Sequence, residues 1–182
     1  MDLQLKGHNV LITGGTKGIG RAIAETLSDE GCNIALCARN PDDVKAAQES
    51  IAAKGVKVAA QALDVADADA FAAWIAEAGE ALGGIDAFVS NVSGSNGKGD
   101  DGWISQFNYN ILSAVHGVEA CKPFFAKSSN PSIVMISTTA ALEHFMNAGP
   151  YNAMKAGLLN YSGALSQELG ANGVRVNAIS PG

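Results

Sequence analysis

Short apolar runs alternate with longer segments of helical periodicity along the whole chain. The apolar runs predict six strands, at residues 9–13, 33–38, 56–62, 85–90, 132–137 and 174–179. The segments between them predict helices at 18–30, 42–54, 67–82, 102–127 and 151–171. This alternation is typical of parallel βαβ units, and strands that are apolar nearly throughout indicate a sheet with helices on both faces. The pattern therefore predicts an α/β fold.

Glycines stand just past several predicted helix ends, where a left-handed residue closes the last turn: Gly31, Gly55, Gly83, Gly84 and Gly173. One loose segment, 93–102, follows the fourth strand. It is either a flexible connector or a loop over a ligand, because ligands of such sheets lie beyond the carboxyl ends of the strands. Neither an internal repeat nor a linker is visible, so residues 1–182 are expected to form a single domain.

Composition narrows the possible partners. The chain has 182 residues, 47% of them hydrophobic, which is enough for a core without disulfides or metals. Cys32, Cys37 and Cys121 match neither a zinc ribbon nor a redox pair and are interpreted as reduced, small hydrophobic residues. A formal charge of −6 argues against nucleic acid. The apolar runs are too short to span a membrane, and the start lacks a secretory pattern, so a cytoplasmic location is expected.

The first strand leads directly into a glycine-rich turn and then a helix. Glycine lets backbone amides approach a phosphate closely, and the first turn of a helix offers unpaired N–H groups at a positive dipole end. The arrangement predicts dinucleotide binding, with a purely structural turn as the alternative. The candidate phosphate-binding residues are Gly14, Thr16, Lys17, Gly18, Ile19 and Gly20.

From this motif onward the sequence resembles the classical short-chain dehydrogenases/reductases, whose glycine motif reads Thr-Gly-x-x-x-Gly-x-Gly. Tyr151-x-x-x-Lys155 resembles the catalytic pair of that family, and Asn177 to Gly182 resembles its segment against the nicotinamide. The resemblance implies a Rossmann-type, doubly wound parallel sheet and an oxidoreductase acting on an alcohol or ketone. It also implies cofactor contacts from Asp64, Val65, Asn91, Tyr151, Lys155, Pro181 and Gly182.

The end of the second strand indicates which nicotinamide cofactor is used. An NAD enzyme normally has a carboxylate there for the ribose 2′-hydroxyl, whereas this chain has Ala38 followed by Arg39. Arg39 can hold a 2′-phosphate through paired hydrogen bonds, and Lys17 adds a second positive charge. We therefore expect NADP(H) rather than NAD(H). The alternative for Arg39 is a solvated charge near Asp42 and Asp43.

Tyr151 and Lys155 lie four residues apart in a predicted helix and therefore share a face. Reducing a ketone requires a proton donor, and a phenol with a reference pKa of about 10 suits neutral pH poorly. A nearby ammonium stabilises the phenolate and lowers such a pKa. Tyr151 is thus the predicted general acid and base, and the resemblance implies that Lys155 also holds the nicotinamide ribose. The alternative is an exposed helix face.

The resemblance supplies two further catalytic candidates. Thr138 stands where the family usually has a Ser that holds the substrate oxygen, with Ser137 as the second choice. Asn110 stands at the position of the catalytic Asn, which helps to hold a water in the proton relay; the alternative is an amide on a helix surface. The family further implies a homotetramer or homodimer built partly on the helices at 102–127 and 151–171.

Some features depart from the family pattern. Ser93 replaces its glycine after the fourth strand, which moves the glycine to position 94. The sequence stops at Gly182, where the family continues into a substrate lid and a seventh strand, so we expect mainly the cofactor half of the site. Candidates for the pocket entrance are Glu143, His144, Phe145 and Met146, with a surface loop as the alternative for His144, while His8 and His116 are interpreted as structural. A catalytically silent cofactor sensor or scaffold remains the alternative function.

Overall fold

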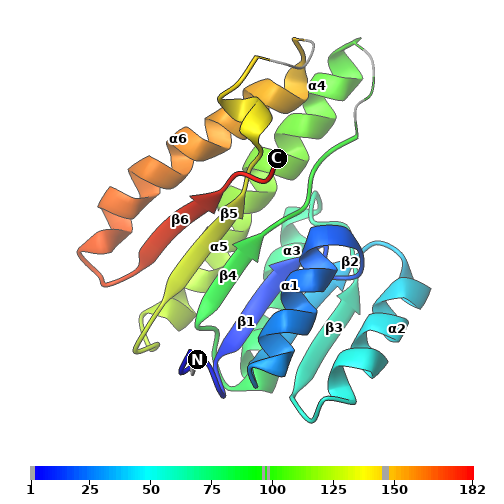
Figure 1. Cartoon of the computed structure of the whole chain (residues 1–182), viewed down its shortest axis with the longest axis vertical. Coiled ribbons are helices and arrows are strands. Elements are labelled where there is room, and N and C mark those ends of the chain that lie inside the picture. The colour runs from blue at the N-terminus through cyan, green and yellow to red at the C-terminus, as the bar shows by residue number, and fades with distance from the viewer. Residues whose placement is uncertain (1–2, 96, 98, 145–147) are drawn as a thin grey trace.

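Six parallel strands form one open sheet in the computed structural model, which describes residues 3–95, 97, 99–144 and 148–182. The strand order is β3-β2-β1-β4-β5-β6. The strands are β1 (Asn9–Thr13), β2 (Asn33–Ala38), β3 (Val58–Ala62), β4 (Ala87–Ser90), β5 (Ser132–Ile136) and β6 (Arg175–Ile179). The order reverses between β1 and β4, which is the position where sheets of this type bind ligands beyond the strand ends. Figure 1 shows this Rossmann-type topology, which confirms the predicted fold class.

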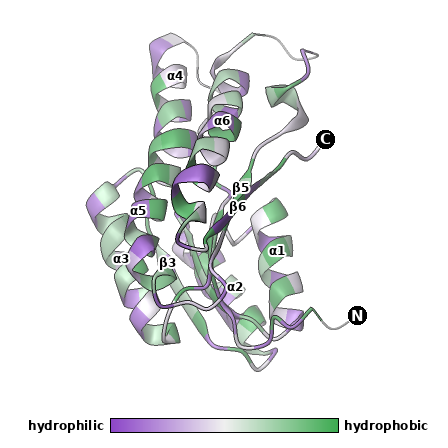
Figure 2. Ribbon diagram, turned by 90° about the vertical axis from the view of Figure 1, so that its left-hand side faces the viewer, coloured by the Kyte–Doolittle hydropathy of each residue, from purple (hydrophilic) through white to green (hydrophobic). Residues whose placement is uncertain are grey.

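Helices cover both faces of the sheet (Figures 1 and 2). One apolar core contains Ala24 and Ala47, from the helices α1 and α2. The core on the opposite face contains Phe71, Val118 and Leu158, from α3, α5 and α6. The helices are α1 (Gly18–Asp29), α2 (Pro41–Ala52), α3 (Ala68–Leu82), α4 (Gly99–Phe107), α5 (Ser113–Phe125) and α6 (Pro150–Gly170), with short π and 3-10 segments η1 (Asn108–Leu112) and η2 (Thr139–Ala141).

The predicted helix at 102–127 was wrong in one respect, because the π segment η1 separates α4 from α5. In η1 the hydrogen bonds span five residues, as from the Ser113 N–H to the Asn108 carbonyl. The predicted loop at 93–102 was also too long, since α4 begins at Gly99. Asp100 and Asp101 lie in the first turn of α4, where the positive end of the helix dipole favours carboxylates.

Smaller features agree with the sequence predictions. Gly31, Gly55, Gly83 and Gly173 have positive φ angles of 83°, 85°, 89° and 77°, as expected of residues that close helices. The three cysteines are free and buried, and burial raises the pKa of the Cys37 thiol to about 12. Within the described residues, no helix is long and apolar enough to cross a membrane.

Candidate functional site: a nucleotide cleft and a Tyr–Lys pair

The turn from β1 into α1 is built on glycines that cannot be replaced freely. Gly14 and Gly18 have φ angles of +67° and +55°. A Cβ on Gly20 would collide with the Gly14 carbonyl oxygen and with the Asn91 side chain. Lys17 is the N-cap of α1 and forms no side-chain capping hydrogen bond. The first-turn amides of α1 are therefore open to an anion, as a pyrophosphate requires.

Asn91 joins this turn to the end of β4. Its side-chain amide donates a 2.9 Å hydrogen bond to the Thr13 carbonyl oxygen, and its backbone N–H donates a 3.0 Å bond to Thr13 Oγ1. These two hydrogen bonds hold the end of β1 to the residue that follows β4. Asn91 has a firm structural function beneath the predicted cofactor position.

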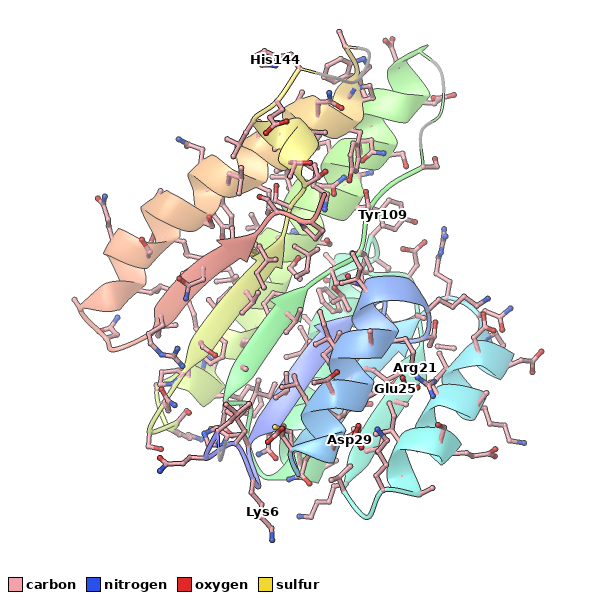
Figure 3. The ribbon with its side chains drawn as sticks, viewed as in Figure 1. Lys6, Arg21, Glu25, Asp29, Tyr109 and His144 are labelled. Atoms are coloured by element: carbon pink, nitrogen blue, oxygen red, sulfur yellow. The ribbon has the colours of Figure 1, made fainter. Side chains whose placement is uncertain are left out.

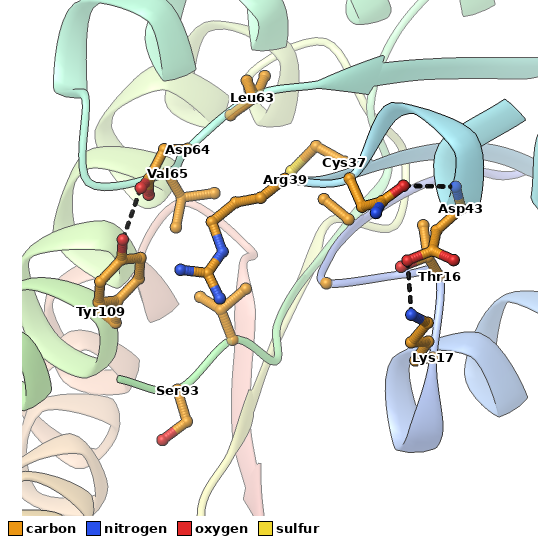
Figure 4. Close-up of a pocket in the computed structure, with 14 residues that line it drawn as sticks. Thr16, Lys17, Cys37, Arg39, Asp43, Leu63, Asp64, Val65, Ser93 and Tyr109 are labelled. Atoms are coloured by element: carbon orange, nitrogen blue, oxygen red, sulfur yellow. Dashed lines mark hydrogen bonds and ion pairs between the residues drawn. The ribbon is translucent and has the colours of Figure 1, made fainter. Parts of the chain in front are cut away.

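A cavity of about 400 Å³ lies beyond the carboxyl ends of β1, β2 and β3 (Figure 4). Six of the predicted cofactor residues line it: Gly14, Thr16, Lys17, Arg39, Asp64 and Val65. Other predicted residues lie outside its lining, namely Gly18, Ile19, Gly20, Asn91, Tyr151, Lys155, Pro181 and Gly182. The cavity also contains Tyr109, which the sequence analysis did not identify. Residues of the glycine turn, Gly14, Thr16 and Lys17, therefore lie beside Arg39 and Asp64 in one cavity.

The two cations of the cavity differ in their surroundings. The Lys17 ammonium forms a 2.6 Å ion pair with Asp43, and its side chain is 75% exposed. The Arg39 guanidinium carbon instead lies 5.7 Å from the centre of the Tyr109 ring. Arg39 is exposed, and its guanidinium points toward Tyr109 and away from Asp43 (Figure 4).

Tyr109 contacts both Arg39 and Asp64 in this cavity. Its hydroxyl donates a 2.6 Å hydrogen bond to Asp64 Oδ2, while the Ala66 N–H donates to Asp64 Oδ1. Burial, followed by the Asp64 carboxylate, raises the pKa of the Tyr109 phenol. Tyr109 lies beside the switch point of the sheet in Figure 3. No sequence signal links it to Asp64, which is 45 residues away.

The predicted catalytic lysine is buried where α6 meets the end of β5. Lys155 is 2% exposed, which rules out the alternative of an exposed helix position. Its ammonium donates a 2.7 Å hydrogen bond to the Ile136 carbonyl oxygen, and Ser137 Oγ donates a 3.1 Å bond to the Lys155 carbonyl oxygen. Burial lowers the pKa of Lys155 to about 8. Ser137 therefore anchors the helix, whereas Thr138 remains the candidate for the substrate oxygen.

Tyr151, in the first turn of α6, and Thr138, just after β5, are both half-buried. Pro150 occupies the first turn of α6, where its fixed φ and missing N–H are tolerated, and this places Tyr151 one helical turn before Lys155. Thr138 Oγ1 accepts a 3.3 Å hydrogen bond from the Ala140 N–H, so its own proton is free to be donated. The Thr139 N–H donates to the Pro181 carbonyl oxygen at 3.0 Å, which brings the predicted nicotinamide segment beside Thr138.

Asn110 is 1% exposed, so the alternative of a surface amide was wrong. Its Nδ2 donates to the Gln106 carbonyl oxygen at 2.9 Å and to Gln106 Oε1 at 2.5 Å. Gln106 Nε2 in turn donates to the Gly94 carbonyl oxygen at 3.0 Å. Gln106 was not identified from the sequence, although its spacing of four residues from Asn110 was a usable signal. This buried network joins the loop after β4 to the π segment.

The predicted pocket entrance is described only in part. Phe145 and Met146 lie outside the described residues, and Glu143 and His144 are exposed. His144 lines a shallow pocket with Trp103 and Pro150, at the top of the molecule in Figure 3 and away from Tyr109. His8 Nδ1 is 3.1 Å from the Leu5 carbonyl oxygen, and His116 is half-buried on α5, both in agreement with structural roles.

Comparisons with known proteins show the family of the chain. The family model for short chain dehydrogenases matches residues 8–182, so the chain belongs to the short-chain dehydrogenase/reductase family. It is 36% identical to the isoepoxydon dehydrogenase of Penicillium expansum, over 98% of this chain and 71% of that protein. The structure of L-sorbose reductase from Gluconobacter frateurii, complexed with NADPH and L-sorbose, matches with a TM-score of 0.94 and 32% identity, over 100% of this chain and 72% of that one.

A further match has a different cofactor. Carveol dehydrogenase from Mycobacterium avium, in complex with NAD, has a TM-score of 0.90 and 26% identity, over 97% of this chain and 70% of that one. The fold therefore binds nicotinamide cofactors in general, and its relatives include both dehydrogenases and reductases. The choice between NADP and NAD therefore depends on the residues of this particular chain.

Proposed function

We propose that the protein is an NADP(H)-dependent oxidoreductase that interconverts an alcohol and the corresponding ketone or aldehyde. The observation that carries the proposal is the buried Lys155 ammonium, one helical turn from Tyr151 and anchored at the carboxyl end of β5. Burying a charged group costs free energy, and buried groups with a shifted pKa are concentrated at functional sites. Membership of an oxidoreductase family supports the same reading.

When bound, the nicotinamide supplies or takes up the hydride. Tyr151 donates the proton to the substrate oxygen during reduction and removes it during oxidation. The Lys155 ammonium favours the phenolate form electrostatically, and Lys155 would also hold the ribose of the cofactor. Thr138 donates a hydrogen bond from its hydroxyl to the substrate oxygen and thereby orients the carbonyl. Asn110 and the loop that its network holds would support the proton relay.

The cofactor preference rests on the end of β2. Ala38 leaves space where a carboxylate would repel a phosphate, and Arg39 extends into the same cavity. The pyrophosphate would lie on the open first turn of α1, with Gly14, Gly18 and Gly20 allowing its close approach. Asp64 and Val65 would contact the adenine, and Asn91, Pro181 and Gly182 would lie near the nicotinamide half.

The physiological partner would be a small alcohol or carbonyl compound. We also propose a homodimer or homotetramer, supported by three exposed apolar side chains on α4: Trp103 at 46%, Ile104 at 57% and Phe107 at 41%. Light scattering coupled to size-exclusion chromatography measures this state directly. A monomer at micromolar concentration would contradict the oligomer.

The test of the function is NADPH oxidation against a panel of ketones, aldehydes and sugars, with the reverse reaction on the matching alcohols. Wild-type protein is expected to turn over at least one carbonyl, Thr138→Ser to retain activity, and Thr138→Val and Tyr151→Phe to lose about 100-fold or more in kcat. NADPH binding without turnover of any panel compound would favour a silent sensor instead.

A further inference from the structure

Tyr109 holds two functional side chains of the nucleotide cavity at once (Figure 4). Its ring faces the Arg39 guanidinium at 5.7 Å, within the range of a cation–π contact. Its hydroxyl donates the 2.6 Å hydrogen bond to Asp64. Arg39 follows β2 and Asp64 follows β3, whereas Tyr109 belongs to η1. A single residue thus connects the ends of β2 and β3 to η1, the segment that contains Asn110.

The contact matters because Tyr109, and not a carboxylate, is the side chain that restrains Arg39. Among the residues that the structure describes, no carboxylate lies within ion-pair distance of Arg39, whereas Asp43 engages Lys17 at 2.6 Å. An exposed arginine otherwise samples many rotamers, and fixing it on a phosphate costs conformational entropy. A ring that already restricts the guanidinium lowers this cost, in the same way as other preorganised binding groups.

We propose that Tyr109 is a positioning residue for recognition of the phosphorylated adenosine ribose. Its ring holds the Arg39 guanidinium in the cavity for a 2′-phosphate, and its hydroxyl holds the Asp64 carboxylate turned toward the adenine. This inference rests on the proposed NADP(H) function. It adds a second determinant of 2′-phosphate recognition besides Arg39 at the end of β2, because Tyr109 belongs to η1.

The experiment compares two small probes by isothermal titration calorimetry: adenosine 2′,5′-bisphosphate and adenosine 5′-monophosphate. The measured quantity is the ratio of their dissociation constants, which reports recognition of the 2′-phosphate alone. Tyr109→Leu removes the ring and is expected to reduce the preference for the bisphosphate by roughly two- to fivefold. Tyr109→Phe keeps the ring and is expected to retain the wild-type ratio. In an Arg39→Ala background, Tyr109→Leu is expected to change the ratio no further.

A general loss of fold would weaken both probes together and leave their ratio unchanged, and thermal unfolding of each variant identifies it. If Tyr109→Leu does not fold, Tyr109→Met serves as the ring-free variant. An unchanged ratio in a folded ring-free variant, with the preference still abolished by Arg39→Ala, would overturn the role of Tyr109 and leave the cofactor assignment intact. Equal binding of both probes by the wild-type protein would overturn the NADP(H) assignment itself.

Discussion

The Lys155 ammonium donates a 2.7 Å hydrogen bond to the carbonyl oxygen of Ile136, the last residue of β5. Through this bond a side chain that is 2% exposed joins α6 to the carboxyl end of β5. Desolvation of the ammonium is the cause of its lowered pKa. The residue that we propose for the chemistry should therefore also make the stability of the protein depend on pH.

Stability is predicted to rise with pH because of Lys155. The lysine pKa is about 8 in the folded protein against 10.5 for the free side chain, so between these values the unfolded chain binds more protons. The free energy of unfolding therefore increases over that range, by at most about 1.4 kcal/mol per pH unit for one group. Urea unfolding of the wild type and of Lys155→Met from pH 7 to 10.5 measures the difference.

The control for this prediction is Lys127→Met, which removes an exposed lysine. Because this variant also removes one lysine charge, a change common to both variants is not due to the burial of Lys155. A wild-type minus Lys155→Met difference that stays flat between pH 8 and 10.5 would show that the ammonium is not desolvated as the structure indicates.

Two glycine substitutions are predicted to have opposite effects. Gly20→Ala places a Cβ against the Gly14 carbonyl and Asn91, so it should destabilise the protein by about 1–3 kcal/mol and weaken NADPH binding at least tenfold. Gly163→Ala lies in α6 with nothing within 4 Å of the added atom, and should stabilise the protein by about 0.5–1 kcal/mol. Thermal unfolding and NADPH fluorescence titration test both. Equal effects of the two variants would contradict the close packing at Gly20.

The buried side-chain amide of Gln106 is predicted to contribute more to stability than the hydroxyl of its half-buried neighbour Ser105. Gln106→Leu leaves the Gly94 carbonyl without its donor and Asn110 Nδ2 without one acceptor, which should cost about 1–3 kcal/mol. Ser105→Ala removes only the exposed contacts to Ser95 and should stay within about 0.5 kcal/mol of the wild type. Chemical denaturation distinguishes them; a Gln106→Leu variant as stable as Ser105→Ala would refute the network.

Cofactor choice is predicted to depend on Arg39 far more than on Lys17. Arg39→Ala should weaken NADPH binding by about ten- to a hundredfold, and Ala38→Asp with Arg39→Ala should gain NADH use. Lys17→Ala should weaken NADPH binding less than Arg39→Ala does, because Asp43 already forms an ion pair with the Lys17 ammonium. Steady-state KM values for both cofactors check this, and a wild type that uses NADH and NADPH equally would exclude the assignment.

The sequence was sufficient for the parts of the protein that depend on periodicity. Strands such as Asn33–Ala38 are fully apolar at their centre, and the glycine turn has spacing that few other structures require. Apolar patterns do not distinguish hydrogen bonds that span four residues from those that span five, so the π segment at Asn108–Leu112 was not predicted. Contacts between distant segments, such as Tyr109 with Asp64, have no local signal and required the folded structure.

Measuring the transfer of deuterium from NADPH to a carbonyl compound tests most directly whether Tyr151 and Lys155 serve a reduction by NADPH. Wild-type protein is incubated with NADPH deuterated at the transferable position and with the carbonyl panel, and the products are analysed by mass spectrometry. We expect one deuterium on the carbinol carbon of at least one product, and its loss in Tyr151→Phe under conditions where that variant still binds NADPH. Tight NADPH binding with no deuterated alcohol from any carbonyl, or full transfer in Tyr151→Phe, would contradict it.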